Sequence, residues 1–190
     1  MKKQLLLMGA LLLSGMSFGQ NQQPANIIDA DNLSEAELQH LNTIAPKDGW
    51  VLVKYKGEKY LRNFSNKDYM LSLFIQCADA TQKPGYLVEY SDEYGDKEMG
   101  GLDFLSSSDN SFSKVIFYLD GKSFNDPFSD IRSKNFGDFY QAMKTAKVLK
   151  IEAFNEEMNP ETGKQELKLN RGIDFKLANG TLLDQPVTCR

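Results

Sequence analysis

Few residues in this chain have side chains that could carry out covalent or metal chemistry. The sequence holds two cysteines, Cys77 and Cys189, and one histidine, His40. A Ser-His-Asp or Cys-His set would have to be built on that histidine, and a lone histidine on a helix is usually solvated. A tetrahedral zinc site would need carboxylates to complete its ligands, which is unusual. This inventory predicts a non-catalytic protein without a cofactor or a metal.

The N-terminus has the pattern of a signal peptide. Lys2 and Lys3 precede an apolar stretch, residues 5–13, and a short polar segment that ends at Gly19. Small residues before Gln20 suit signal peptidase, so we expect residues 1–19 to be removed. No cysteine follows the expected cleavage site, which argues against a lipid anchor. The protein is therefore predicted to be periplasmic or secreted.

An exported chain with two distant cysteines favours a disulfide. In the strand-like run from Tyr69 to Cys77 the apolar residues alternate, and Cys77 shares their inward face. Near the C-terminus, Asn179-Gly180 is a turn signal that sends the tail back toward the domain. A free buried thiol or a nucleophile at Cys77 is the alternative. We expect a Cys77–Cys189 bridge that ties the tail to the core.

Length and charge restrict the classes of partner. Loss of Lys2 and Lys3 with the signal peptide moves the formal net charge from −4 to −6. A nucleic-acid site needs a clustered basic face, and no such stretch is present, so we expect no nucleic-acid partner. The apolar part of the signal peptide is shorter than the roughly 20 residues of a membrane span, and no later stretch is longer, so we expect a protein that is not membrane-embedded.

Two segments carry helix signals. Ser34 and Glu37 form a capping-box pattern, and the helix that starts there ends before Pro46. A second helix is predicted from the helical spacing of apolar residues between Phe136 and Ala146, with Asp138 as a cap. Before the first helix, residues 20–32 are rich in Gln, Asn and Pro and are expected to be a flexible leader, so the domain spans residues 33–190.

Alternating apolar residues between turn signals predict eight or nine short strands. The expected strands are 50–55, 60–64, 69–77, 86–90, 101–105, 115–119, 148–154, 165–169 and 173–177. With only two helices, a parallel sheet would lack its crossovers. The fold class is therefore mainly β, an antiparallel β-sandwich or partly open barrel with two short helices.

Several of these segments together resemble a known group. The chain runs from Trp50-Val51 through Leu71-x-Leu73-x-Ile75-x-Cys77 to the helix after Asp138, and then to Phe175-Lys176-Leu177 and the terminal Cys189. This order is similar to that of small exported proteins of the type VI secretion accessory and invasion-associated locus B kind. The resemblance implies a sandwich with a binding or accessory role and implies no catalytic residues.

Acidic residues gather between Glu89 and Asp103, with Lys97 as the one base. Tyrosine beside charge on a loop suits recognition of a protein partner in the cell envelope. The candidate partner-binding residues are Tyr90, Asp92, Glu93, Tyr94, Asp96 and Glu98. Solvated charge and a cation site are the other interpretations of this loop. The loop 155–166 also has oxygen ligands at EF-hand-like spacing, but Pro160 stands where such a loop needs glycine.

The leading hypothesis is an exported, non-catalytic binding or accessory protein, such as an inhibitor or immunity-type partner. A cell-envelope hydrolase with paired carboxylates is the first alternative, and its carboxylates would have to converge in a cleft. A small-ligand carrier is the second. It would need an internal cavity lined by the phenylalanines at 74, 104, 117 and 175.

Overall fold

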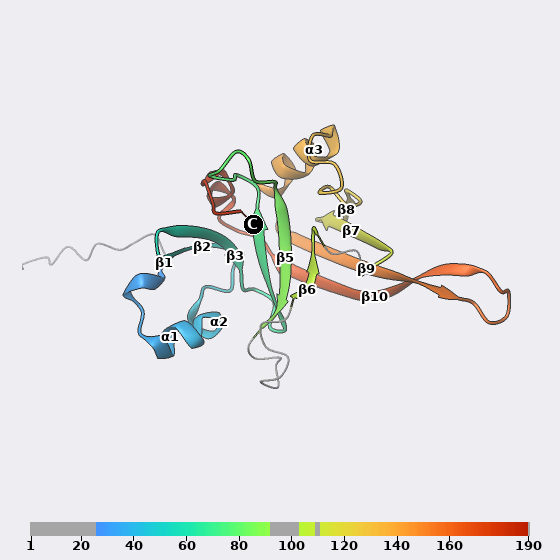
Figure 1. Ribbon diagram of the computed structural model, residues 1–190, viewed down its shortest axis with the longest axis horizontal. Helices are drawn as coiled ribbons and strands as arrows, with labels where there is room; N and C mark the ends of the chain where they lie inside the picture. The colour runs from blue at the N-terminus through green and yellow to red at the C-terminus, as the bar shows by residue number, and fades with distance from the viewer. Residues whose placement is uncertain (1–25, 92–102, 109–110, 190) are drawn as a thin grey trace, which may run out of the picture.

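The computed structural model describes residues 26–91, 103–108 and 111–189, and these form a two-sheet β structure, as the sequence predicts (Figure 1). The larger sheet has six strands in chain order, and the smaller has four in the order β10-β9-β7-β8. Neither sheet closes on itself among the described residues. The fold is thus a sandwich-like arrangement and not a closed barrel.

The six-stranded sheet is antiparallel except at its first strand, β1, which pairs parallel to β2. A two-residue turn, Lys56-Gly57, joins β2 to β3, and both of its residues have positive φ. Its strands are β1 (Ile27–Asp29), β2 (Trp50–Tyr55), β3 (Glu58–Asn63), β4 (Tyr69–Phe74), β5 (Gly85–Tyr90) and β6 (Asp103–Ser106).

The four-stranded sheet is antiparallel, and two of its strands are long. Asp120-Gly121, again with positive φ at both residues, closes the tight turn between β7 and β8. The strands are β7 (Lys114–Leu119), β8 (Lys122–Ser123), β9 (Val148–Met158) and β10 (Gln165–Lys176). The sequence pattern splits β10 in two, whereas the structure continues it through an irregularity between Leu169 and Arg171. It also extends β9 to Met158, beyond the strand end expected at Phe154.

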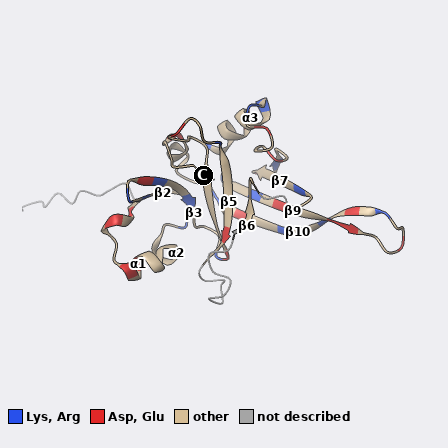
Figure 2. Cartoon of the chain, viewed as in Figure 1, with Lys and Arg blue, Asp and Glu red and all other residues tan. Residues whose placement is uncertain are grey.

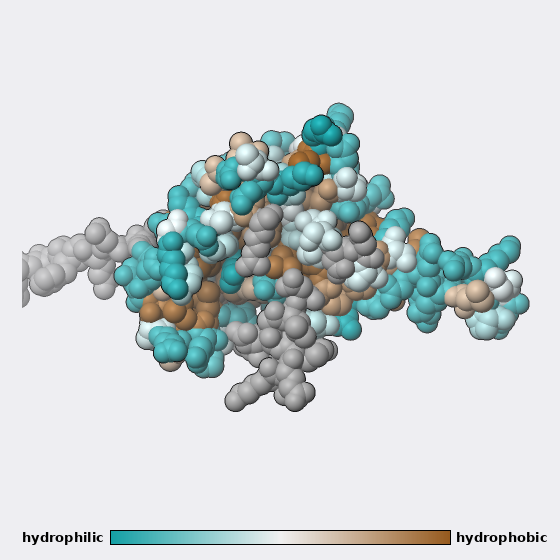
Figure 3. All heavy atoms as spheres, viewed as in Figure 1, coloured by the Kyte–Doolittle hydropathy of each residue, from teal (hydrophilic) through white to brown (hydrophobic). Residues whose placement is uncertain are grey.

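Two hydrophobic clusters fill the faces of the six-stranded sheet. Alternation in β2 sends Trp50 and Leu52 into the main core between the sheets, and Val51 and Val53 into a second core. The second core lies under the N-terminal segment, where Figure 3 shows apolar residues gathered between the helices and the sheet. Both faces of this sheet are therefore covered at β2, β3 and β4.

The helices form where the sequence places them, with changes in detail. The capping box of Ser34 and Glu37 is present, but the first helix divides at His40 into α1 (Glu35–Gln39) and α2 (Leu41–Ile44). The third helix, α3 (Lys134–Met143), starts earlier than expected. Its cap is Ser133, whose Oγ accepts from the Phe136 amide at 3.2 Å, while Asp138 pairs with Lys134 one turn away. The prediction of Asp138 as cap was wrong.

The expected leader also needs correction, because its last residues are ordered. Ile27–Asp29 pair with β2, and Ala30–Asn32 form a 3-10 helix, η1. Ile27 packs on the main core and Ile28 on the second core. Three residues are too few to show a strand period in the sequence, so this strand owes its stability to pairing and docking.

The C-terminal tail returns to the sheet as expected. Asn179 has a left-handed φ of 59°, and the chain then enters a 3-10 helix, η2 (Gly180–Asp184), where the sequence suggested only a tight turn. Val187 bridges Cys77 in parallel, and the Thr188 amide donates to the Lys59 carbonyl at 2.8 Å. The Cys77–Cys189 disulfide closes this junction, as predicted, with Cys189 buried.

Candidate functional site

A surface cleft of about 900 Å³ lies between the strands β5 and β6 and the segment before α3. One wall comes from the start of β5 and from Ser106, Ser107 and Ser108 at the end of β6. The other wall comes from residues 128–132. A second hollow of about 450 Å³ shares Tyr86, Ser106, Ser107 and Ser129 with the first and continues it toward β7. We treat the two hollows as one cleft.

The β6 wall is fixed by close packing against β5. A Cβ on Gly85 would lie 2.3 Å from the Ser107 Oγ, so the absence of a side chain lets that serine lie over the strand. The Tyr86 amide donates to Ser107 Oγ at 3.3 Å, and the Ser107 amide donates to the Tyr86 carbonyl at 3.1 Å. Ser107 is thereby held in place by β5, the strand that contributes to the same wall of the cleft.

Two consecutive side-chain turns stiffen the opposite wall. The Phe128 amide donates to Asp126 Oδ1 at 2.9 Å, and the Arg132 amide donates to Asp130 Oδ1 at 3.1 Å. Burial raises the pKa of Asp126, while the backbone amides of Phe128 and Ser129 act in the opposite direction. Both carboxylates are thus engaged by the backbone of their own wall.

Aromatic rings form the floor of the cleft, but their faces are used inside the protein. Phe74, Tyr86 and Phe128 are all buried. The Tyr86 and Phe128 centroids are 5.0 Å apart, and Phe128 also contacts Phe139 of α3 at 5.9 Å. These rings are therefore poorly placed to serve as open stacking platforms.

The free edge of β6 faces this cleft. Among the described residues no strand pairs with the outer side of β6, and Ser106 on this strand borders the cleft's second hollow. The Ser107 amide donates a hydrogen bond to the Tyr86 carbonyl, and Ser107 Oγ accepts one from the Tyr86 amide. The backbone of Ser107 is therefore directed toward β5. By alternation, Ser106 then directs its N–H and C=O groups away from β5, toward the free edge.

Charged side chains of both signs stand at the cleft. The first hollow is lined by the exposed side chains of Lys83 and Arg132 and by Asp130. The second hollow is lined by the exposed Lys114 and by Asp126. The two aspartates thus border different hollows. With serine hydroxyls between them, these groups can donate and accept hydrogen bonds along an elongated ligand.

His40 lies between α1 and α2, which pack on the other face of the six-stranded sheet.

The sequence-predicted partner-binding residues are described only at their first member. Tyr90 lies at the end of β5, half-buried, with its ring 5.2 Å from that of Tyr69 and 5.6 Å from that of Phe104. Asp92, Glu93, Tyr94, Asp96 and Glu98 lie outside the described residues. The cleft itself was missed, because β6 and residues 128–132 carry only scattered serines and charges in sequence.

The four phenylalanines considered for a carrier cavity are packed side chains. Phe117 and Phe175 are each 1 % exposed in the main core. Phe74 is buried, and Phe104 contacts Tyr69 and Phe112 at 5.3 and 5.4 Å. The rings themselves occupy the space that a ligand would need.

The loop considered for calcium is a β-hairpin. Residues 155–158 belong to β9, Glu166 belongs to β10, and the Asn159 side chain donates to Glu166 Oε1 at 2.9 Å. Across the described residues, no group of three or more His, Cys, Asp and Glu side chains could hold a metal ion. In the same part of the chain no helix is long and apolar enough to span a membrane.

No family model, curated protein or solved structure matches this chain. The geometry of the cleft and of the chain around it therefore carries the functional argument.

Proposed function

We propose that this is an exported binding protein that holds an extended polypeptide segment of a partner along β6 in the cleft. The observation that carries the proposal is the free edge of β6 bordering a hollow of about 450 Å³ that opens into one of about 900 Å³. An extended peptide can add to such an edge, where main-chain hydrogen bonds give affinity and side-chain contacts give specificity.

The lining of the cleft favours a polypeptide over the other ligand classes. Sugars are usually held on open aromatic faces, and here the rings of Tyr86 and Phe128 pack on each other and are buried. A lipophilic ligand would need an apolar interior, and the cleft walls carry serines with Lys83 and Arg132. Hydroxyls, both charge signs and unpaired backbone groups match the groups that a peptide presents.

A hydrolase is less well supported by the same residues. Asp126 borders one hollow and Asp130 the other, and each accepts a hydrogen bond from an amide of its own turn. A glycosidase needs two carboxyl groups facing one scissile bond from opposite sides. The hydrogen bonds of Asp126 and Asp130 instead fit a structural role, in which each aspartate stabilises a turn of the cleft wall.

Export and an accessory role are parts of this proposal. The Cys77–Cys189 bridge is typical of an oxidising compartment, and the signal-peptide pattern of residues 1–19 agrees with it. The resemblance to small exported accessory proteins would imply the same kind of role. Under this proposal the partner is a protein of the cell envelope.

A random peptide display library selected on the purified protein tests this function. Peptides that bind should lose most of their affinity for the double variant Lys83→Glu with Arg132→Glu, which reverses the exposed basic residues of the first hollow. The matched control is Lys67→Glu with Lys164→Glu, which makes the same change in net charge at two exposed sites outside the cleft. Its affinity should stay near that of the original protein.

Two results would count against the proposal. The first is a selection that enriches no peptide. The second is a set of peptides that bind both double variants equally well, because such peptides would be held outside the cleft.

A further inference from the structure

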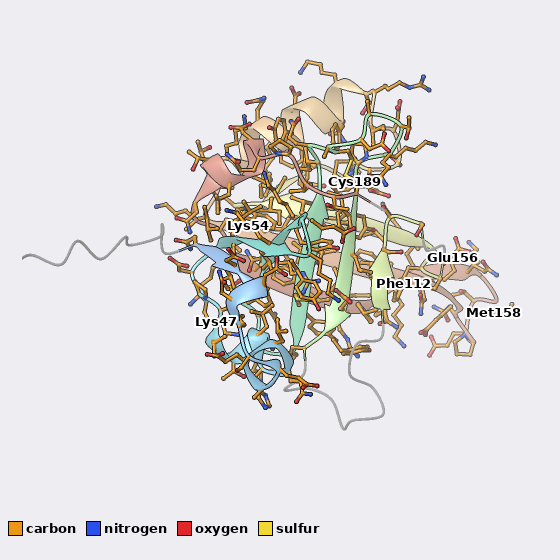
Figure 4. The ribbon with its side chains drawn as sticks, turned by 60° about the vertical axis from the view of Figure 1, so that its left-hand side comes forward. Lys47, Lys54, Phe112, Glu156, Met158 and Cys189 are labelled. Carbon is orange, nitrogen blue, oxygen red and sulfur yellow. A yellow bond between two sulfur atoms is a disulfide. The ribbon has the colours of Figure 1, made fainter. Side chains whose placement is uncertain are left out.

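The hairpin of β9 and β10 forms an arm that extends away from the two sheets (Figure 1). Strand β7 pairs with β9 only as far as Phe154, which lies opposite Leu169 of β10. Beyond this pair the arm is a two-stranded ribbon, and Met158 lies near its far end (Figure 4). Residues 160–170 are exposed throughout. The outer part of the arm therefore stands in solvent.

The outer edge of β10 is protected next to the body and bare farther out. Near the body, the Asn63 side chain donates to the Lys176 carbonyl at 2.7 Å, and the Lys176 amide donates to Ser65 Oγ at 2.7 Å. The Asn66 side chain donates to the Asp174 carbonyl at 3.0 Å. Along residues 165–169, no strand in the described part of the chain pairs with this side of β10.

The pairing pattern identifies which residues face that bare edge. The Ser113 amide donates to the Phe154 carbonyl at 2.9 Å, so Phe154 directs its backbone toward β7 and Asn155 directs its own toward β10. Asn155 lies opposite Lys168. By alternation, Lys168 and Glu166 bond to β9, and the backbone groups of Gln165, Leu167 and Leu169 face outward.

The charges on the arm are unbalanced within one chain. Glu157 lies directly opposite Glu166, and like charges in such a cross-strand pair are destabilising. Lys168 bonds to Glu157, with Nζ 2.9 Å from Oε2, which leaves Glu166 with only the neutral side-chain amide of Asn159. Figure 2 shows acidic and basic residues interspersed along the arm. A lysine of another chain opposite Glu166 would give this carboxylate a cationic neighbour.

The other face of the ribbon carries exposed apolar side chains beside Glu156 and Gln165. Met158, Leu167 and Leu169 are 67 %, 48 % and 49 % exposed. The pairing register places all three on one face, together with Phe154. An exposed edge strand with such a face is a template for pairing with another strand.

We infer that the occupant of this edge is a second copy of the chain, which pairs β10 with β10 in antiparallel orientation around a two-fold axis at Leu167. In this register Leu167 meets Leu167 of the second copy, and Gln165 meets Leu169. Each of these pairs has its backbone groups directed outward, so the two strands can exchange hydrogen bonds.

The same register also gives Glu166 a cationic neighbour, with each Lys168 shared between Glu157 of its own chain and Glu166 of the other. Glu166 comes opposite Lys168 of the second copy, and the symmetry repeats this contact in the other direction. Strands that are self-complementary in backbone, charge and apolar residues favour a second copy over an unrelated partner. Because the contact spans only five residues in each copy, its area is small and the dimer should be weak and concentration-dependent.

Sedimentation velocity of the purified protein, from micromolar to millimolar concentration, tests this dimer. Leu167→Pro removes an outward-facing N–H that the arm does not use, a change that an edge strand tolerates, and it should abolish the dimer. Leu167→Val keeps the N–H and is the control, which should still dimerise. Circular dichroism checks that both variants stay folded.

Charge reversal gives an independent test that does not depend on proline. Glu166→Lys and Lys168→Glu should each weaken the dimer, by roughly tenfold in Kd, because two cross-strand pairs become repulsive. Mixing the two single variants should restore association, since each supplies the charge that the other lacks.

The wild-type protein remaining monomeric at all concentrations would overturn the inference and would leave the edge to a different partner. A dimer that survives Leu167→Pro and both charge reversals would also overturn it, because the contact would then use another surface.

Discussion

The disulfide between Cys77 and Cys189 joins two residues 112 positions apart, at the point where the tail bridges the segment after β4. Backbone hydrogen bonds hold the tail on both sides, since the Val187 amide donates to Gln76 at 2.7 Å and the Thr188 amide to Lys59 at 2.8 Å. The bond therefore reinforces a junction that already belongs to the sheet.

We predict that removing this bond lowers the free energy of unfolding without changing the fold. On the loop-entropy model, a loop of this length contributes about 4 to 5 kcal/mol. Urea unfolding with and without reductant measures the loss. The double variant Cys77→Ser with Cys189→Ser should match the reduced protein and should not respond to reductant; equal stability of the oxidised and reduced forms would contradict the prediction.

Asn63 should be a large single contributor to stability among the polar residues. Its side chain is 0 % exposed, donates to the Lys176 carbonyl and accepts from the Ser65 amide at 2.9 Å, so it joins β3 to the base of β10. Asn63→Ala leaves these groups unpaired, and we expect a loss of about 1–3 kcal/mol in urea unfolding. Asn32→Ala, at an exposed position, is the control and should be nearly neutral.

Two glycines should respond in opposite ways to alanine. A Cβ on Gly180 would lie 2.0 Å from the Lys144 carbonyl oxygen, so Gly180→Ala forces η2 away from the end of α3 and should cost about 1–3 kcal/mol. Gly137 lies within α3, and a Cβ added there would have no atom within 4 Å. Gly137→Ala should raise stability by about 0.5–1 kcal/mol. Thermal unfolding measures the change in stability of each variant. A change in the same direction for both variants would contradict this packing account.

Asp184 should make stability depend on pH at the acidic end. Lys144 Nζ lies 2.6 Å from its carboxylate, and hydrogen bonds from Lys144 and then Tyr140 lower the Asp184 pKa. The stabilisation is present above the unfolded-state pKa of about 3.9 and is lost as the pH falls through the lower folded-state value.

The matching measurement compares the original protein with Asp184→Asn across acidic pH. The stability difference between them should be constant near neutral pH and should shrink as the pH falls below about 4. The Lys144 pKa is raised, chiefly by the Asp184 hydrogen bond, so its contribution is lost only as the pH rises through that higher value. A difference that grows toward acid pH would refute this sign.

Local patterns in the sequence predict the elements well where one physical cause acts alone. The capping box at Ser34 and the alternation from Tyr69 onward both hold in the structure, because capping and strand alternation depend on neighbouring residues. The strand after Tyr69 stops at Phe74, short of the predicted Cys77, since the chain there leaves β5 to bridge Val187. Tertiary pairing of this kind has no local signal.

The candidate site is harder to predict for the same reason. The cleft joins Ser107 of one sheet with residues 128–132 before α3, and its width depends on how the two sheets pack. The bare edge of β10 likewise follows from Asn63, Ser65 and Asn66 covering only its inner half. Sequence spacing between such distant segments does not show which of them meet.

Amide hydrogen exchange along β6, followed by NMR with and without a selected peptide, tests the central claim most directly. The Ser106 amide faces the free edge, whereas the Leu105 amide is directed to β5, where Leu105 lies opposite Val88. If the peptide adds to β6, exchange at the Ser106 amide should slow strongly on binding while Leu105 changes little. Tight peptide binding with unchanged exchange at the Ser106 amide would contradict the account.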